Sequence, residues 1–426
     1  MRFFTSDEAG LIKGIDIDAK VSLLEAQSRA AKRARADAKA KTVAKASKAG
    51  AAATAETAQS TKLEGIDMWT VSGTVSRTQG IQQMSNIKWE TDTDAFVVGR
   101  NNGDVEVLSK DTGKSLYKFS EANFADKFSI KHNGRFITER RYVGLGGDRD
   151  GSHFITCTNM GEVRYQSFTG DGATLMKVNA DTYRMRVHQK RPSIFAVGGR
   201  EQELTVWDAD TVESGSQSEF TKPRSAPLFK SKNVSNDSLD LRMPVWITDM
   251  QFMDDNASTP LVAVSTGHRQ IRIYDAKAQQ RPVLDWEVSK HPIYHILASH
   301  VRPEMFFADN MGNVQQLDTR MGRVVGGYKG IAGAVKAMAI SEDGSMIAAA
   351  GLDRFLRVYE AGGMRRALHR AYIKQRVSQV VWDWDRRDLS TEEIEQKEAE
   401  DIWQNMDVLS QERSEKRPSK RKVAAA

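Results

Sequence analysis

The sequence repeats one local pattern, and this repetition constrains the fold more than any other feature. In AVGGREQELTVWDADT, from Ala196 to Thr211, an apolar run is followed by a polar turn and then by a run of alternating apolar and polar residues. Two such runs joined by a few turn residues are typical of a β-hairpin. The pattern occurs seven times, and its second strands begin at Ile12, Val105, Val163, Leu204, Ile271, Val314 and Leu356.

The spacing between the copies predicts the architecture. Three of the intervals are 41, 43 and 42 residues, which matches the roughly 40–45 residues of a WD-type propeller blade with four strands, a to d from the centre outward. The longer intervals mark insertions. A closed ring of such repeats uses most of the chain as one unit. We therefore predict an all-β protein with a seven-bladed WD40-type β-propeller over residues 1–387.

The two ends of this region are predicted to share one blade. Arg2 to Thr5 and Leu11 to Asp16 supply strands b and c, but no inner strand precedes them. VSQVVWDW, from Val377 to Trp384, supplies an inner strand with no hairpin after it. Pairing the C-terminal strand with the N-terminal hairpin would close the ring and leave no exposed sheet edge.

Three segments outside the repeats differ sharply in charge. Residues 22–62 form an Ala/Lys-rich insertion in the first blade, and residues 29–62 carry nine Lys/Arg against two Asp/Glu. With almost no large apolar residues, the insertion is predicted to be disordered. It is either a tolerated loop or a basic arm for nucleic acid or nuclear import.

The C-terminal region divides into an acidic and a basic part. Residues 388–410 open with Ser390 and Glu393, a capping-box pattern, and predict an acidic amphipathic helix. Residues 411–426 are predicted to be a disordered basic tail. Its cluster is of the nuclear-localisation or nucleic-acid type and consists of Lys416, Arg417, Lys420, Arg421 and Lys422.

Composition restricts the cellular context. A single cysteine, Cys157, excludes an internal disulfide framework and favours a reducing compartment. No apolar run approaches the roughly 18 residues of a membrane span. We expect a soluble, intracellular protein without a membrane partner.

Propeller topology assigns distant residues to a common surface, because the b-to-c and d-to-a loops share one face of the ring. That face would receive many arginines, whose forked guanidinium suits phosphate and carboxylate. The alternative is that these side chains are merely solvated. No aromatic residues interleave with them, which argues against sequence-specific reading of single strands. The predicted partner- or RNA-binding residues of this face are Arg100, Arg200, Asp237, Asp240, Arg242, Arg269, Arg354, Lys374 and Arg376.

Catalysis finds little support in the sequence. The eight histidines are scattered, and His291, His295 and His300 lack the spacing of a zinc motif. A propeller hydrolase with a metal in its channel would need carboxylates or histidines at matching inner-strand positions, where this sequence is mostly apolar. We therefore predict no catalytic residue, no metal, no cofactor and no small-molecule substrate.

Four segments resemble a known family. They are NDSLDLRMPVWITDMQF (Asn236 to Phe252), VAVSTGHRQIRIYDAKAQQRPVL (Val262 to Leu284), GLDRFLRVYE (Gly351 to Glu360) and AYIKQRVSQVVW (Ala371 to Trp382). Together they resemble the nucleolar WD-repeat proteins of large-ribosomal-subunit assembly, the Nop-seven-associated factor of fungi and its animal counterpart. The similarity spans essentially the whole propeller and is specific in its second half.

The resemblance implies a non-enzymatic scaffold of the pre-60S ribosomal particle, acting in rRNA processing in the nucleus and nucleolus. Its implied partners are pre-ribosomal RNA, other assembly factors and a AAA-type ATPase that releases it. It also implies that Asn236 to Pro244, with Asp237, Asp240 and Arg242, is a binding element; the alternative is that these side chains brace their own loop. The alternative function is a WD40 adaptor of a nuclear chromatin or ubiquitin-ligase complex.

Overall fold

The structure, a computed structural model, describes residues 1–17, 66–89, 93–121, 124, 129–132, 135–148, 151–169, 172–212, 220–254 and 256–383. Regular structure in these residues is β-strand apart from one short 3-10 helix, Arg77–Gln79. No helix in the described part of the chain is long and apolar enough to cross a membrane. The insertion 22–62, the predicted helix 388–410 and the basic tail 411–426 lie outside the described residues.

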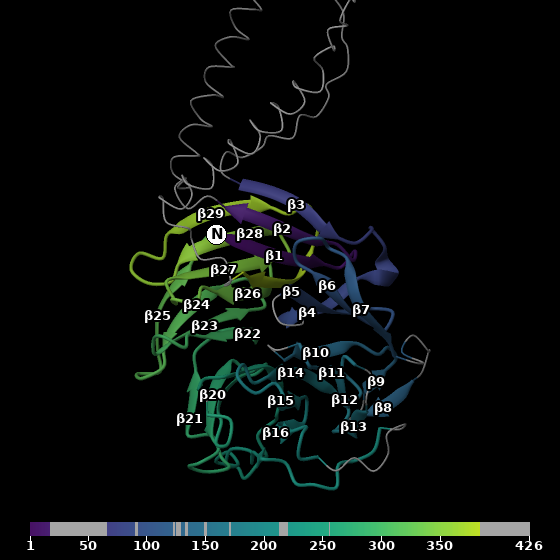
Figure 1. The fold of residues 1–426 in the computed structure, drawn as a ribbon. Helices are drawn as coiled ribbons and strands as arrows, with labels where there is room; N and C mark the ends of the chain where they lie inside the picture. The colour runs from purple at the N-terminus through teal and green to yellow at the C-terminus, as the bar shows by residue number, and fades with distance from the viewer. Residues whose placement is uncertain are drawn as a thin grey trace, which may run out of the picture. The chain divides into compact units, whose positions relative to one another are not determined.

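Seven four-stranded antiparallel sheets form a ring of seven blades (Figure 1). This confirms the propeller predicted from the repeat. Each inner strand packs beside the inner strand of the next blade, and the last packs beside the first. In blade order the inner strands are β30 (Val377–Trp382), β4 (Ile81–Trp89), β10 (Tyr142–Gly147), β14 (Thr182–Val187), β18 (Ile247–Phe252), β22 (Ile293–Ala298) and β26 (Val335–Ile340).

In blades two to seven, the other three strands follow the inner strand along the chain and lie progressively outward. They are β5 (Thr93–Arg100), β6 (Asp104–Ser109) and β7 (Ser115–Ser120); β11 (His153–Thr158), β12 (Glu162–Ser167) and β13 (Ala173–Lys177); β15 (Ile194–Gly199), β16 (Gln202–Asp208) and β17 (Phe229–Lys230); β19 (Leu261–Thr266), β20 (Gln270–Asp275) and β21 (Leu284–Glu287); β23 (Glu304–Asp309), β24 (Val314–Asp318) and β25 (Arg323–Tyr328); and β27 (Met346–Gly351), β28 (Phe355–Glu360) and β29 (Ala367–Tyr372).

Blade one is built from both ends of the propeller, as predicted. Strands β1 (Arg2–Asp7), β2 (Ile12–Ile17) and β3 (Ile66–Ser72) lie outward from β30. The pairing of β1 with β30 is antiparallel, and the rings of Phe3 and Trp382 meet edge to face with centroids 4.4 Å apart. Lys13 Nζ donates a hydrogen bond of 2.7 Å to the carbonyl of Ile373. The ring is therefore closed by backbone, aromatic and polar contacts together.

The connection between blades two and three contains a small sheet that the sequence analysis did not predict. Strands β8 (Ile130–His132) and β9 (Arg135–Ile137) pair as an antiparallel hairpin. The residues that follow, up to Glu139, line the mouth of the central channel. This connection thus contributes to the surface around the channel mouth.

Apolar side chains from adjacent blades share each section of the core. Val143 and Ile155 of blade three pack with Met185 and Phe195 of blade four, and all four are buried. Close approach requires a small residue on β10, because a β-carbon added to Gly144 would lie 2.4 Å from the β-carbon of Met185. The Gly-rich run 144–147 is therefore explained by packing between blades.

Candidate docking surface

Every blade places its b-to-c turn on the side of the ring where its inner strand begins, which we call the top face. In each blade a backbone N–H of that turn donates to the carbonyl of the residue immediately before the inner strand, at 2.8 to 3.4 Å. The donor and acceptor pairs are Glu8 and Arg376, Asn101 and Gly80, Asn159 and Arg141, Arg200 and Asp181, Gly267 and Trp246, Asn310 and Pro292, and Leu352 and Ala334. This repeated contact confirms that the two loop classes share one face.

Arg100 reaches the top face but is not free to bind a partner. Its side chain is 6% exposed, and Nε donates to Glu106 Oε2 at 2.8 Å. Nη1 donates to the carbonyls of Gln79 at 3.0 Å and Gly10 at 3.4 Å. The guanidinium joins blade two to the turn of blade one, so the geometry favours a structural role for Arg100 over the predicted docking role.

The loop before β18 carries three of the predicted binding residues, and two of them brace the loop itself. Asp237 Oδ1 accepts hydrogen bonds from the backbone of Leu239 and Leu241, both at 2.9 Å. Asp240, at a φ of 57°, accepts from Asn236 Nδ2 at 2.8 Å. Leu239 and Leu241 are 75% and 59% exposed. The fixed turn therefore presents apolar side chains, which the sequence analysis did not single out.

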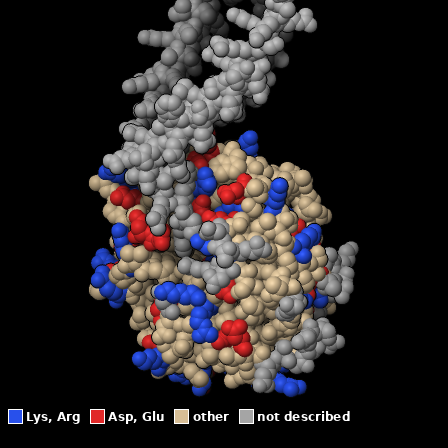
Figure 2. Space-filling model, viewed as in Figure 1, with Lys and Arg blue, Asp and Glu red and all other residues tan. Residues whose placement is uncertain are grey.

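Two further predicted arginines form ion pairs with acids of the same face. Arg242 Nη1 lies 2.9 Å from Glu201 Oε2, and Arg269 Nη2 lies 2.9 Å from Glu287 Oε1. Pairs this exposed contribute about 0–1 kcal/mol and are screened by salt. Figure 2 likewise shows Lys and Arg interspersed with Asp and Glu on the side of the propeller in view. The positive charge of these arginines is thus partly balanced locally.

Three predicted cations lie close together in the chain fold and form no ion pair with a described acid. Arg354, Lys374 and Arg376 are exposed, and none forms an ion pair with a described residue. The carbonyl of Arg354 accepts from the backbone of Ile373, which places the b-to-c turn of blade seven beside the loop that leads into β30. We call Arg354, Lys374 and Arg376 the basic corner.

Aromatic residues do accompany the arginines. The guanidinium of Arg200 lies 4.0 Å from the centroid of the Trp246 ring. Trp246 also approaches His268 at 6.2 Å and Tyr294 at 6.3 Å, and Tyr294 lies 6.5 Å from Tyr183. The prediction that aromatics do not interleave with arginine is therefore wrong. The sequence did not indicate these contacts because the residues come from neighbouring blades and are far apart in the sequence.

A charged cluster inside the channel was missed by the sequence analysis. Asp249 on β18 is fully buried and accepts from Arg184 Nε and from Arg186 Nε and Nη2, each at 3.1 Å. Backbone N–H groups of Met250 and Ile296 also donate to it. Both arginines lie on β14. One buried carboxylate therefore organises two guanidinium groups from the neighbouring blade.

The protonation states of this cluster follow from its contacts. Burial alone would raise the pKa of Asp249, but Arg184, Arg186 and a hydrogen bond with His295 outweigh it and lower that pKa. Burial, together with the charge of Arg184, lowers the pKa of His295 despite the opposing effect of Asp249. The carboxylate is thus ionised and the imidazole neutral near pH 7. The two guanidiniums and one carboxylate leave a net positive charge.

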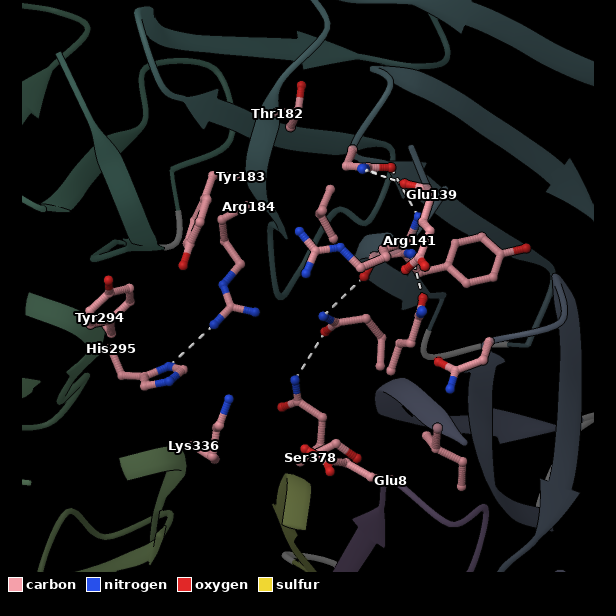
Figure 3. Close-up of a pocket in the computed structure, with 18 of the residues that line it drawn as sticks. Glu8, Glu139, Arg141, Thr182, Tyr183, Arg184, Tyr294, His295, Lys336 and Ser378 are labelled. Carbon is pink, nitrogen blue, oxygen red and sulfur yellow. Dashed lines mark hydrogen bonds between the residues drawn. The ribbon is translucent and has the colours of Figure 1, made fainter. Parts of the chain in front are cut away.

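The channel opens on the top face into a cavity of about 890 Å³. It is lined by the first residues of inner strands, by b-to-c turns and by Phe136 to Glu139. In Figure 3 the side chains of Arg184, His295 and Lys336 point toward one side of this space, with Tyr183 and Tyr294 beside them. The cavity is a second candidate contact surface within the same face.

Relatives of known name were found, although no protein-family model matches the chain. WD repeat-containing protein 74 of Bos taurus is 29% identical over 306 residues, covering 66% of this chain and 76% of that protein. Ribosome biogenesis protein nsa1 of Schizosaccharomyces pombe is 30% identical over 257 residues, covering 56% and 65%. Ribosome biogenesis protein NSA1 of Yarrowia lipolytica is 28% identical over 260 residues, covering 55% and 60%.

The chain is a homologue of these proteins. The WD-repeat name fits the turns that follow the third strands of its blades. Asp208, Asp275 and Asp318 accept from the backbone N–H two residues later, at 3.2, 2.8 and 2.8 Å. These aspartates fix turns, as the sequence analysis predicted.

Cys157 is the single cysteine of the sequence. Cys157 on β11 is fully buried, and burial raises the pKa of its thiol, so it packs as an apolar residue. Within the described residues, no group of three or more His, Cys, Asp or Glu side chains could hold a metal ion.

The basic cluster near the C-terminus lies outside the described residues, so nuclear localisation stays a prediction. It consists of Lys416, Arg417, Lys420, Arg421 and Lys422.

Proposed function

We propose that this WD-repeat homologue is a non-enzymatic assembly factor of the large-ribosomal-subunit precursor, acting in rRNA processing. The observation that carries the proposal is its homology to proteins named for ribosome biogenesis. The closed propeller supports a scaffold role, because turns on its top face present several fixed contact surfaces to partners. Release by a AAA-type ATPase is a prediction from family resemblance.

Docking is assigned to the basic corner, together with the exposed leucines of the loop before β18. Arg354, Lys374 and Arg376 suit phosphate or carboxylate groups of the particle, since none of them forms an ion pair with a described acid. Leu239 and Leu241 project from a hydrogen-bonded turn, so little ordering entropy is lost when a partner covers them. The geometry of Asp237 and Asp240 supports loop bracing as their role.

Association with the particle tests the proposal directly. Tagged full-length protein should recover large-subunit precursor RNA and ribosomal proteins from nuclear extract. Recovery of chromatin-complex or ubiquitin-ligase subunits without rRNA would instead support the adaptor alternative. Replacing Arg354, Lys374 and Arg376 with Glu should reduce recovery by about tenfold or more, because reversed charges oppose the partner.

A matched control uses the opposite face of the propeller. Lys114, Lys277 and Arg281 are exposed in c-to-d loops, and none forms an ion pair with a described residue. Replacing them with Glu makes the same change in net charge. Equal recovery by the two triple variants would exclude the basic corner as the docking surface.

Nuclear and nucleolar residence follows from the proposed role and is tested separately. Deleting residues 416–422 should reduce nuclear accumulation, because this removes the predicted basic localisation cluster. Imaging of a fluorescent fusion measures the change. An unchanged distribution would assign nuclear entry to the basic insertion at residues 29–62.

A further inference from the structure

The cavity at the channel mouth has two chemically different walls. Arg184, His295 and Lys336 occupy one side, whereas Glu8 and Glu139 lie on the other together with Arg141 (Figure 3). Its volume of about 890 Å³ falls within the roughly 300–1,000 Å³ of ligand pockets in proteins. The space can therefore receive part of another molecule. The charges on its walls determine the chemical class of that molecule.

The cationic wall is held in place by the buried cluster. Arg184 uses Nε to bind Asp249 and Nη2 to bind His295 Nδ1 at 3.2 Å. Its Nη1 makes no hydrogen bond to a described residue, and its side chain is 11% exposed. A guanidinium fixed at two nitrogens with the third available is a pre-organised donor.

A second donor faces the same side of the cavity. Lys336, on β26, is exposed and forms no ion pair with a described residue. His295 Nδ1 lies 3.2 Å from Arg184 Nη2 and 3.6 Å from Asp249 Oδ2, so the imidazole is anchored to the buried cluster. Arg184 and Lys336 thus present N–H donors from blades four and seven, next to His295 of blade six and the rings of Tyr183 and Tyr294.

The acids of the lining decide between two classes of anionic ligand. Glu8, Glu139 and Asp181, which directly precedes β14, all line the cavity, and they equal in number the lining cations Arg141, Arg184 and Lys336. A nucleic-acid strand carries a negative charge on every phosphate and would meet these carboxylates at short range. A peptide can place a single carboxylate on the cationic wall while its neutral backbone or a basic residue meets the acids.

We propose that the channel mouth binds an extended peptide segment of a protein partner by capturing one acidic side chain between Arg184 and Lys336. Tyr183 and Tyr294 cover the apolar part of that side chain. This site goes beyond the docking at the basic corner, and its test does not depend on the ribosomal role. Partner and particle association are therefore measured separately.

Selection from a phage-displayed library of random twelve-residue peptides on the immobilised full-length protein tests the proposal. Peptides with an Asp or Glu at a recurring position should be enriched. Their synthetic, fluorescein-labelled forms should lose affinity by about tenfold or more on Lys336→Glu, because one charge-assisted bond is replaced by repulsion. Exchanging the acidic residue of the peptide for Lys should abolish binding to the unmodified protein, because the new charge would face both Arg184 and Lys336.

The control variant is Lys290→Glu, which changes the same charge on the same face. Lys290 is exposed in the loop before β22 and does not line the cavity. Its variant should bind the selected peptides like the unmodified protein. Since Lys336 is exposed, both variants should keep the melting temperature, whereas substitutions of Arg184 would disturb the buried cluster.

Three results would overturn the proposal. The first is selection of no peptide with a recurring acidic residue. The second is equal binding of the selected peptides to the unmodified protein and to Lys336→Glu. The third is binding of a labelled uridine decamer, but of no selected peptide, in a manner abolished by Lys336→Glu, which would make the mouth a nucleic-acid site.

Discussion

The cluster of Asp249, Arg184 and Arg186 and the basic corner both have a net positive charge, but they carry it in opposite ways. Arg184 and Arg186 share a fully buried carboxylate, whereas Arg354, Lys374 and Arg376 are exposed and unpaired with any described acid. A buried charge is costly unless it is paired, while an exposed charge is solvated and weakly coupled to folding. The first cluster should therefore govern stability, and the second should govern association.

The largest effect should come from removing the buried carboxylate. Asp249→Ala leaves two guanidinium groups and a half-buried histidine without their common partner, so we expect a loss of about 3–5 kcal/mol in the free energy of unfolding. Urea unfolding followed by circular dichroism measures it. Glu287→Ala breaks an exposed pair with Arg269 and should cost at most about 1 kcal/mol. Similar losses for the two variants would refute the distinction between the clusters.

A substitution of Arg100 tests whether this arginine of the top face stabilises the fold or binds a partner. Arg100→Met removes two hydrogen bonds to loop carbonyls and an ion pair with Glu106, and should cost about 1–3 kcal/mol. Glu106 keeps Lys118 at 3.4 Å, which limits the loss. We expect the folded variant to associate with the particle normally below its melting temperature. Reduced association with the particle at unchanged stability would show that Arg100 belongs to the docking surface.

Substitution of the exposed leucines should weaken association with the particle without lowering stability, which is the reverse of the effect expected for Arg100. Replacing Leu239 and Leu241 with Ser removes apolar contacts from a partner, and we expect about tenfold weaker particle recovery. The unfolding free energy should stay within about 0.5 kcal/mol, because both side chains are solvent-exposed. A control pair, Met311 and Met321, is 59% and 76% exposed in other loops. Equal loss with the control pair changed to Ser would show a general effect of surface apolarity.

The sequence predicted the ring because its evidence is local and repeated. Hairpin alternation and a spacing of 41 to 43 residues identify blades, and an unpaired inner strand at Val377 identifies the closure. The hairpin of β8 and β9 also had a local indication, since Asn133-Gly134 separates its strands and is typical of tight hairpins. It was overlooked because both strands are only three residues long.

The top-face chemistry could be predicted only in part. Topology placed Arg354 and Lys374 on one side of the ring, but pairing partners are set by contacts between distant residues. Arg184 and His295 are 111 residues apart, and no motif links them. The signal in the sequence was the presence of charged residues on the inner strands. Such residues must face the channel or a neighbouring blade.

The smallest predicted effect is a change in the pH dependence of stability. Burial lowers the pKa of His295, so the unfolded chain binds this proton more readily than the folded protein. Stability from this group is complete above the unfolded pKa of about 6.5 and falls as the pH drops through it. Asp249, whose pKa is also lowered, stays ionised in this window. Replacing His295 with Asn should therefore reduce the slope of unfolding free energy against pH between about 7.5 and 5.5, measured in urea. The other seven histidines stay in both proteins, so the difference in slope reports on His295 alone, and identical slopes would contradict its neutral state.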